Sequence, residues 1–178
     1  MSNFREIVTK AVIGKAKKTS TNKFVLSPEE VPNTVLGCWV INNSFSGVNN
    51  LGSVLVNGSF DVNVWYSYDN DTKTAVSTKR FTYQEKMNVP LKSDSVLDNT
   101  SEIIVRSLKQ PTVTNVEVKG SNIELTIEKE LGVEIVGNTK VKVSVEDFDD
   151  DYEEILDDEI DNEIDNIKEE YLDTEEVK

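Results

Sequence analysis

The chain has 178 residues, enough for one domain of ordinary size, and carries 33 acidic against 19 basic residues for a net charge of −14. It contains no histidine, which removes the commonest general base and the commonest ligand of transition metals. A single cysteine, Cys38, excludes an internal disulfide and a zinc site built from several thiolates. Most classes of enzyme are therefore disfavoured, and we expect neither a cofactor nor a metal.

The negative charge is concentrated at one end of the chain. Residues 1–145 hold 15 acidic and 17 basic residues, a net charge near +2, whereas residues 146–178 hold 18 acidic residues and two lysines, a net charge near −16. Dense runs of like charge repel themselves and are typical of solvated interaction tails. The sequence thus predicts a nearly neutral body over residues 1–145 and an acidic tail over residues 146–178.

Residues 1–18 form a basic opening segment. Five apolar residues recur there at helical spacing: Phe4, Ile7, Val8, Ala11 and Val12. This spacing favours a short amphipathic helix, with a strand as the alternative. The cations from Arg5 to Lys23 could touch nucleic acid or an anionic membrane, but a solvated face explains them better, so we predict neither partner. The segment lacks the apolar core of a secretory signal, and no apolar run of the chain is long enough to span a bilayer, which predicts an intracellular protein.

From Val35 onward the pattern has the period of two that is typical of strands. Both faces of the run from Leu36 to Ile41 are apolar, which predicts a strand covered on both sides, with Trp39 in the core. Asn57-Gly58 between two such runs predicts a tight hairpin turn, and Asp69-Asn70-Asp71 predicts another.

The next strand places its residues on two distinct faces. One face is apolar and holds Phe60, Val62, Val64, Tyr66 and Tyr68, while the other holds Asp61, Asn63, Trp65 and Ser67. Trp65 is thus an aromatic residue among polar neighbours, an arrangement that is common at protein interfaces. We therefore select Trp65, Asp61 and Asn63 as candidate contact residues, with the covering of a sheet edge as the alternative role of Trp65.

The second half of the body continues the strand pattern. Phe81, Tyr83 and Met87 alternate along one face that Glu85 interrupts, and Gly120-Ser121-Asn122 separates two runs that can pair, Val116 with Val118 and Ile123 to Ile127. Val141, Val143 and Val145 form a last strand after Gly137, whereas residues 90–111 give no readable pattern. Seven to nine short strands without alternating helices predict an all-β fold, an antiparallel β-sandwich.

The acidic tail carries an apolar stripe. Six residues recur every three or four positions: Tyr152, Leu156, Ile160, Ile164, Ile167 and Tyr171. Stacked aspartates on the same segment repel one another at helical spacing, so an isolated helix there is marginal and a partner would complete it. These six residues are further candidate contacts.

The carboxylates of the body allow an enzymatic alternative. Asp61, Asp69, Asp71 and Glu85 could be imagined as a glycosidase pair, but strand and turn positions explain each of them. The aspartates from Asp147 to Asp151 are not followed by the glycine that a calcium loop requires. We therefore predict no catalytic residues and no metal site.

Several segments together resemble one known family. They are Arg5 to Val12, the Ser27-Pro28-Glu29 turn, Leu36 to Asn42, Asn57 to Tyr68, Thr72 to Thr74, Gln110-Pro111 and Val136 to Val143, followed by the acidic tail. In this order they are similar to the outer spore-coat morphogenetic protein CotE family of endospore-forming bacteria. The middle of the body is also similar to β-rich domains of other spore-envelope proteins.

The resemblance implies a non-enzymatic scaffold. Such a protein is made in the mother-cell cytoplasm, associates with itself into a homo-oligomer around the forespore, rests on a basement-layer protein and recruits outer-coat proteins. The residues alone leave two alternatives open: a β-sandwich that binds or hydrolyses a carbohydrate polymer of the cell envelope, and an acidic helix that mimics nucleic acid. A third idea, that the acidic tail of one copy meets the basic segment of another, concerns assembly.

Overall fold

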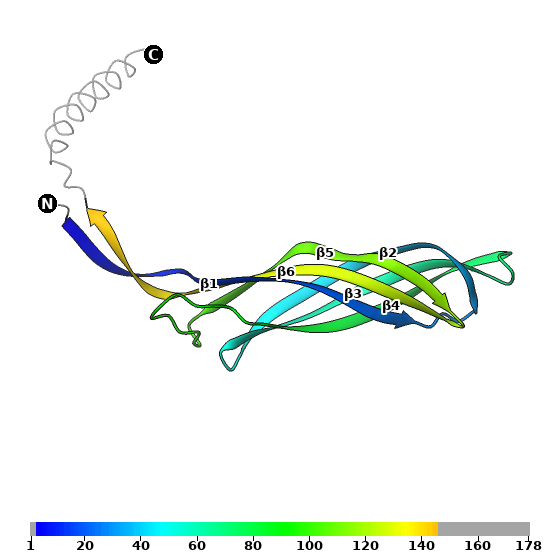
Figure 1. The fold of residues 1–178 in the computed structure, drawn as a ribbon, viewed down its shortest axis with the longest axis horizontal. Helices are drawn as coiled ribbons and strands as arrows, with labels where there is room; N and C mark the ends of the chain where they lie inside the picture. Colours follow the sequence, from blue (N-terminus) through cyan, green and yellow to red (C-terminus); the bar gives the residue numbers. More distant parts are fainter. Residues whose placement is uncertain (1–2, 146–178) are drawn as a thin grey trace, which may run out of the picture. The chain divides into compact units, whose positions relative to one another are not determined.

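The computed structural model describes residues 3–145, which form six β-strands and no helix (Figure 1). The strands are β1 (Asn3–Leu26), β2 (Pro32–Asn50), β3 (Ser53–Tyr68), β4 (Lys73–Met87), β5 (Glu102–Lys119) and β6 (Asn122–Val145). They build two three-stranded sheets, β1-β6-β5 and β2-β3-β4. The predicted all-β fold of antiparallel sheets is confirmed. No helix in the described range is available to cross a membrane.

The described residues divide between two units. Residues 7–141 form one compact unit, and residues 3–6 and 142–145 belong to a second, in which both segments are extended strand. The side-chain contacts described below lie in the first unit. The predicted acidic tail lies outside the described residues.

Tight connections set the register of the sheets. Asp69, Asn70 and Asp71 all have positive φ between β3 and β4, where short polar side chains tolerate the left-handed region, so the predicted turn is confirmed. Gly120, with a φ of 62°, reverses the chain between β5 and β6 and pairs Val118 with Ile123, also as predicted. The two hairpins follow from sequence signals that act over a few residues.

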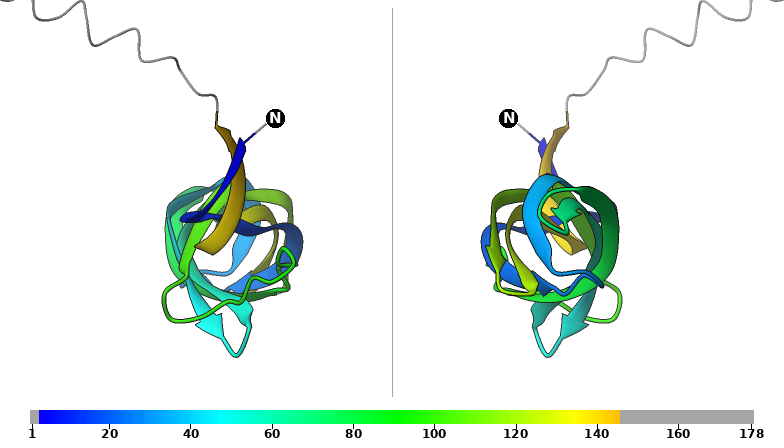
Figure 2. Two further views of the ribbon diagram at one scale, coloured as in Figure 1. Left: turned by 90° about the vertical axis from the view of Figure 1, so that its left-hand side faces the viewer. Right: turned by 90° about the vertical axis from the view of Figure 1, so that its right-hand side faces the viewer.

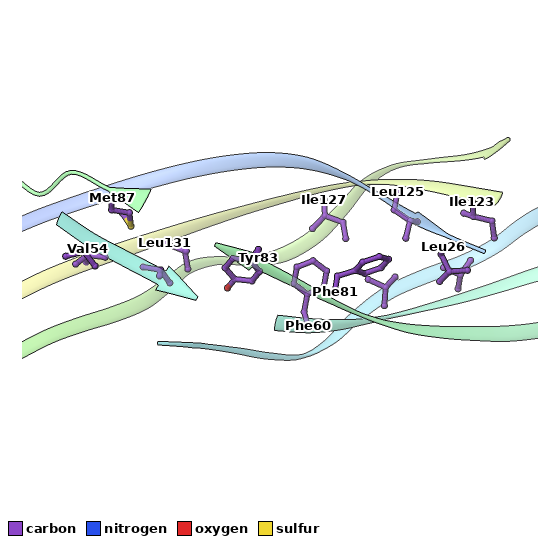
Figure 3. Close-up of a cluster of buried hydrophobic side chains, with 14 of the residues drawn as sticks. Leu26, Val54, Phe60, Phe81, Tyr83, Met87, Ile123, Leu125, Ile127 and Leu131 are labelled. Carbon is purple, nitrogen blue, oxygen red and sulfur yellow. The ribbon is translucent and has the colours of Figure 1, made fainter. Parts of the chain in front are cut away.

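The core lies between the two sheets. Side chains at alternate positions of β3 and β4 meet those at alternate positions of β6 (Figure 3). Phe24 of β1 packs edge-on against Phe60 with ring centroids 5.4 Å apart, and lies 4.9 Å from Phe81. Each fully buried apolar side chain stabilises the fold by about 1.5–3 kcal/mol. The aromatic cluster therefore anchors the first strand to the opposite sheet.

The sheets also approach each other along both sides (Figure 2). Asn43 of β2 donates a hydrogen bond to Gln110 of β5 over 2.9 Å, and Lys79 of β4 donates to the carbonyl of Val25 in β1 over 3.1 Å. Gly47 of β2 lies so close to β5 that a β-carbon there would sit 2.8 Å from the Ile103 side chain. The sandwich is thus nearly closed around its core.

The predicted N-terminal helix is wrong, because residues 3–26 form the strand β1, the alternative that the sequence left open. Val8, Thr9 and Val12 are β-branched and lose side-chain freedom in a helix, and β6 offers a neighbouring strand in the sheet. Apolar residues that recur every three or four positions also fit a strand that is exposed on both faces, because neither face then has to be apolar. Residues 3–10 are exposed in this way. Tertiary pairing thus outweighs the local pattern.

The hairpin predicted at Asn57-Gly58 is also wrong, because both residues lie in the middle of β3. The turn into β3 falls instead at Leu51-Gly52, which have φ values of 51° and 87°. Gly58 has a packing role, since a β-carbon there would overlap the ring of Tyr83 on β4. The glycine of Asn57-Gly58 is thus explained by the close approach of the Tyr83 ring and not by a turn.

The strands are fewer and longer than expected: six strands of 15 to 24 residues replace the predicted seven to nine short ones. β6 continues through Gly137, which faces the buried Ile13. The unreadable stretch 90–111 divides into an irregular connection up to residue 101 and the first half of β5. Pro111 lies within β5 at a register shift, where its missing donor costs no ladder hydrogen bond.

Candidate interaction surface

The outward face of the β2-β3-β4 sheet carries exposed aromatic residues. Val62, Val64 and Tyr66 of β3 point inward and are 0–1% exposed, so Trp65 between them points outward and is 43% exposed. The register pairs Trp65 with Gly37 of β2 and with Val76 of β4. The residues at the same level of three strands therefore share one surface.

Trp39 joins Trp65 on this surface. It pairs with Asn63, one residue pair along the same face, and is 44% exposed. A β-carbon on Gly37 would lie 3.7 Å from Cζ3 of Trp39 and 3.8 Å from Cε3 of Trp65, so both indole rings lie beside this glycine. The absence of a side chain at position 37 thus lets the two rings approach each other across the strands.

Polar contacts border the aromatic residues. Arg80 of β4 donates to Asp61 of β3 through Nε and Nη2, over 2.7 and 3.0 Å, and Asn42 donates to the same carboxylate over 2.9 Å. The hydrogen bonds from Arg80 and from Asn42 lower the pKa of Asp61 to about 2. Thr78 donates to Asn63 in the same row. These polar groups satisfy one another beside the two half-exposed tryptophans.

We call this surface the tryptophan face. It comprises Gly37, Trp39, Ile41, Asp61, Asn63, Trp65, Val76, Thr78 and Arg80. Ile41 and Val76 are also exposed, at 41% and 57%. Exposed apolar groups bordered by polar ones are the usual composition of a protein-protein contact, in which tryptophan and arginine contribute most of the binding energy.

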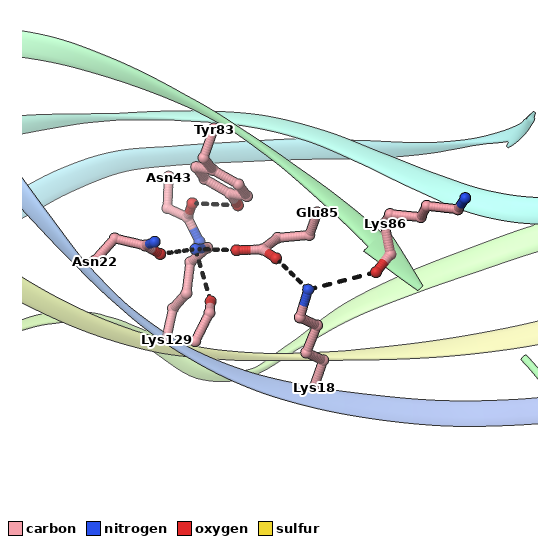
Figure 4. A network of polar contacts seen from close by, with 8 residues as sticks. Lys18, Asn22, Asn43, Tyr83, Glu85, Lys86 and Lys129 are labelled. Atoms are coloured by element: carbon pink, nitrogen blue, oxygen red, sulfur yellow. Dashed lines mark hydrogen bonds and ion pairs between the residues drawn. The ribbon is translucent and has the colours of Figure 1, made fainter. Parts of the chain in front are cut away.

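A buried polar network occupies the interior near the C-terminal end of β4 (Figure 4). The Nζ of Lys129 is 2.9 Å from Oε1 of Glu85, and Lys18 approaches the other carboxylate oxygen at 2.8 Å. Burial raises the pKa of Glu85, but hydrogen bonds from Lys18 and Lys129 outweigh this effect and lower the pKa to about 2. The residue that interrupts the apolar face of β4 is thus an ionised group with two counterions.

Lys129 is itself 2% exposed. Its Nζ donates to the Ser20 hydroxyl over 2.8 Å and to Oδ1 of Asn22 over 3.4 Å, and it lies 4.3 Å from the centre of the Tyr83 ring. A buried ammonium is stable only when such partners satisfy it. Lys129 was not among the predicted site residues, although it alternates at period two with the inward residues Ile123, Leu125, Ile127 and Leu131.

The structure brings three of the predicted contact residues together, since Trp65, Asp61 and Asn63 all lie on the tryptophan face. The prediction that Trp39 belongs to the core, under a strand covered on both sides, is wrong, because the outer side of β2 is open to solvent. Trp39 pairs with Asn63 in the sheet register, so its side chain lies on the outward, polar side that Asn63 also occupies. The six tail candidates from Tyr152 to Tyr171 lie outside the described residues.

The carboxylates once considered for catalysis serve local contacts. Asp61 pairs with Arg80, Glu85 with two lysines, and Asp69 with Lys73 at 3.3 Å, while Ser67 donates a short hydrogen bond to Asp71. Within residues 3–145, no three potential ligands are grouped so that they could hold a metal ion. Each of these carboxylates thus has a structural partner.

Lysines of β1, in the basic opening segment and just after it, face acidic residues of β6. Lys15 lies 3.6 Å from Glu134, and Lys23 lies 3.0 Å from Glu124. Lys17, Arg106, Leu108 and Gly132 are among the residues that line a hollow of about 330 Å³. Lys15 and Lys23 are therefore paired with acidic residues of the neighbouring strand at the surface of the sheet.

Comparison with known proteins gives one family. A family model described as outer spore coat protein E (CotE) matches residues 3–174, nearly the whole chain. No curated protein and no solved structure matches the chain.

Proposed function

Because the chain belongs to the outer spore coat protein E (CotE) family, we propose that it is a scaffold of the spore coat that associates with itself through the tryptophan face. In this proposal it is made in the mother-cell cytoplasm, docks on a basement-layer protein around the forespore and recruits outer-coat proteins. It acts by binding, without catalysis.

The observation that carries the proposal is the pair of tryptophans beside Gly37. Two large aromatic side chains, 44% and 43% exposed on adjacent strands, are costly to leave in water. Their polar neighbours, such as Asp61 and Asn63, are already paired and require no further ligand. A second protein surface would bury the rings without breaking these contacts, which supports self-association there.

We assign the recruitment of outer-coat proteins to the acidic tail. Its charge near −16 and its apolar stripe from Tyr152 to Tyr171 suit a partner surface that is basic and partly apolar. The body and the tail would then have separate tasks, with the body building the layer and the tail binding its clients.

Cells that form spores can test both assignments. The natural gene is replaced by a fluorescent fusion that carries Trp39→Thr and Trp65→Thr, with Leu108→Thr as the matched control. Leu108 is 54% exposed on the other sheet, and threonine keeps the preference for a strand. We expect the double variant to remain diffuse in the mother cell while the control forms a shell around the forespore.

A double variant that still forms a normal shell would exclude the tryptophan face as the assembly surface. For the tail, a chain truncated after Val145 should form the shell but lose outer-coat proteins, measured by mass spectrometry of purified spores. A truncated chain that retains its full set of outer-coat proteins would contradict the role of the tail.

A further inference from the structure

Lys129, Asn22 and Glu85 form an arrangement that the scaffold function does not use. A buried lysine amine lies within hydrogen-bond distance of both a carboxamide and a carboxylate, with the Nζ of Lys129 3.4 Å from Oδ1 of Asn22 and 2.9 Å from Oε1 of Glu85. The carboxamide carbon is one bond from that Oδ1. These are the groups that an amide bond between two side chains requires.

We propose that Lys129 and Asn22 react with each other to form an intramolecular isopeptide bond, with Glu85 as the catalytic residue that transfers the protons. The bond would join β1 to β6, the first and last strands of the chain, which are neighbours in one sheet. This inference does not depend on the tryptophan face, so either proposal can fail alone.

The reaction needs no reagent beyond the three side chains. Glu85 accepts a proton from the Lys129 ammonium, and the lone pair of Nζ attacks the Cγ of Asn22 as the carbonyl electrons move to Oδ1. Glu85 passes its proton to Nδ2 and, as a carboxylate again, accepts the second proton from Nζ. The carbonyl re-forms as the bond from Cγ to Nδ2 breaks with its electrons on nitrogen. The ammonia released takes the proton from Glu85 and enters water as ammonium. No group is oxidised or reduced.

The surroundings position the nucleophile. The Ser20 hydroxyl lies 2.8 Å from Nζ and the Tyr83 ring lies 4.3 Å from it on another side, so the amine has little freedom to leave the site. Holding reacting groups near contact distance accelerates intramolecular reactions greatly. Asn22 is exposed on its other side, which gives ammonia a path to solvent.

Lys18 sets the rate of the reaction. Its ammonium lies 2.8 Å from Oε2 of Glu85 and, together with Lys129, holds that carboxylate in its charged form, which weakens it as a base. The bond should therefore form slowly after folding. Replacing Lys18 by glutamine should strengthen the base and raise the rate, whereas a purely structural ion pair would give no covalent product in either chain.

The test is mass spectrometry of the full chain, purified and then incubated at mildly alkaline pH. We expect the intact mass to fall by one ammonia molecule. Trypsin should then release a branched peptide in which Thr19–Lys23 is joined to Gly120–Lys140, with Lys129 uncut. Cyclisation of Asn22 on its own backbone also releases ammonia, so the branched peptide and the Lys129→Arg variant separate the two reactions.

Lys129→Arg and Asn22→Ala should abolish the branched peptide, and Glu85→Gln should slow its formation by about 100-fold or more, the usual contribution of general acid-base catalysis. Circular dichroism identifies any variant that fails to fold. If one does, the mass of the native chain after incubation serves as the test in its place. A folded native chain that keeps its full mass after prolonged incubation would overturn the proposal. So would loss of ammonia that persists in the Lys129→Arg variant without a branched peptide.

Discussion

Replacing both tryptophans by threonine should weaken self-association of the purified chain and leave its folding intact. A tryptophan side chain presents roughly 250 Å² when fully accessible. Since Trp39 is 44% and Trp65 is 43% exposed, each has about 110 Å² left to bury. At about 25 cal/mol per Å², each ring contributes about 2–3 kcal/mol to association.

A loss of this size raises the dissociation constant by about 30- to 140-fold for each ring. Analytical ultracentrifugation over a range of concentrations measures it, with Leu108→Thr as the control and thermal unfolding to confirm that the body remains folded. If the double variant and the native chain associate with the same constant, the exposed rings do not form the contact and the reasoning fails. Fluorescence provides a second readout, because Trp39 and Trp65 are the only tryptophans of the chain and burial shifts their emission.

Three further predictions concern the body. Gly58→Ala should destabilise the fold by about 1–3 kcal/mol, because the new methyl group meets the ring of Tyr83; chemical unfolding measures this, and an unchanged midpoint would show that the ring moves aside freely. In the unlinked chain Glu85 has a pKa of about 2, below its unfolded value of 4.5, so its ion pairs stabilise the fold above pH 4.5 and this stability is lost as the pH falls toward 2. Unfolding across that range should be less dependent on pH in Glu85→Gln, and equal slopes would refute the assignment. Burial raises the pKa of Cys38 to about 11, so at pH 8 its thiolate fraction, and its rate of alkylation, should be about 100-fold below those of an ordinary thiol; alkylation as fast as that of free cysteine would contradict the burial.

Patterns that act over short distances were readable from the sequence. The apolar face of β3, the turn at Asp69 to Asp71 and the pairing of β5 with β6 all follow from alternation and turn chemistry, and the structure confirms them. The place of Trp65 on the polar, outward side of its strand was likewise predicted, because its polar neighbours share that side. Each of these signals is contained within one strand or one hairpin.

The errors come from contacts between residues that are distant in the sequence. β1 is a strand because β6, about 100 residues later, lies beside it, and no local pattern contains that information. Gly58 faces Tyr83 of β4, and Gly37 lies beside the rings of Trp39 and Trp65. A side chain at either glycine would therefore meet residues of another strand, which the local sequence does not show. The buried position of Lys129 likewise depends on distant partners, because Glu85 of β4 and Ser20 of β1 supply its hydrogen bonds.

The order of the strands also constrains how the chain can fold during synthesis. The β2-β3-β4 sheet is made of successive hairpins and can form as soon as β4 leaves the ribosome, whereas β1 must wait for β6, the last strand of the body. Until then the 24 residues that become β1 lack the neighbouring strand with which their backbone pairs. Because lysines on a strand edge discourage pairing with other chains, we expect those of β1 to limit aggregation of the nascent protein until β6 is made.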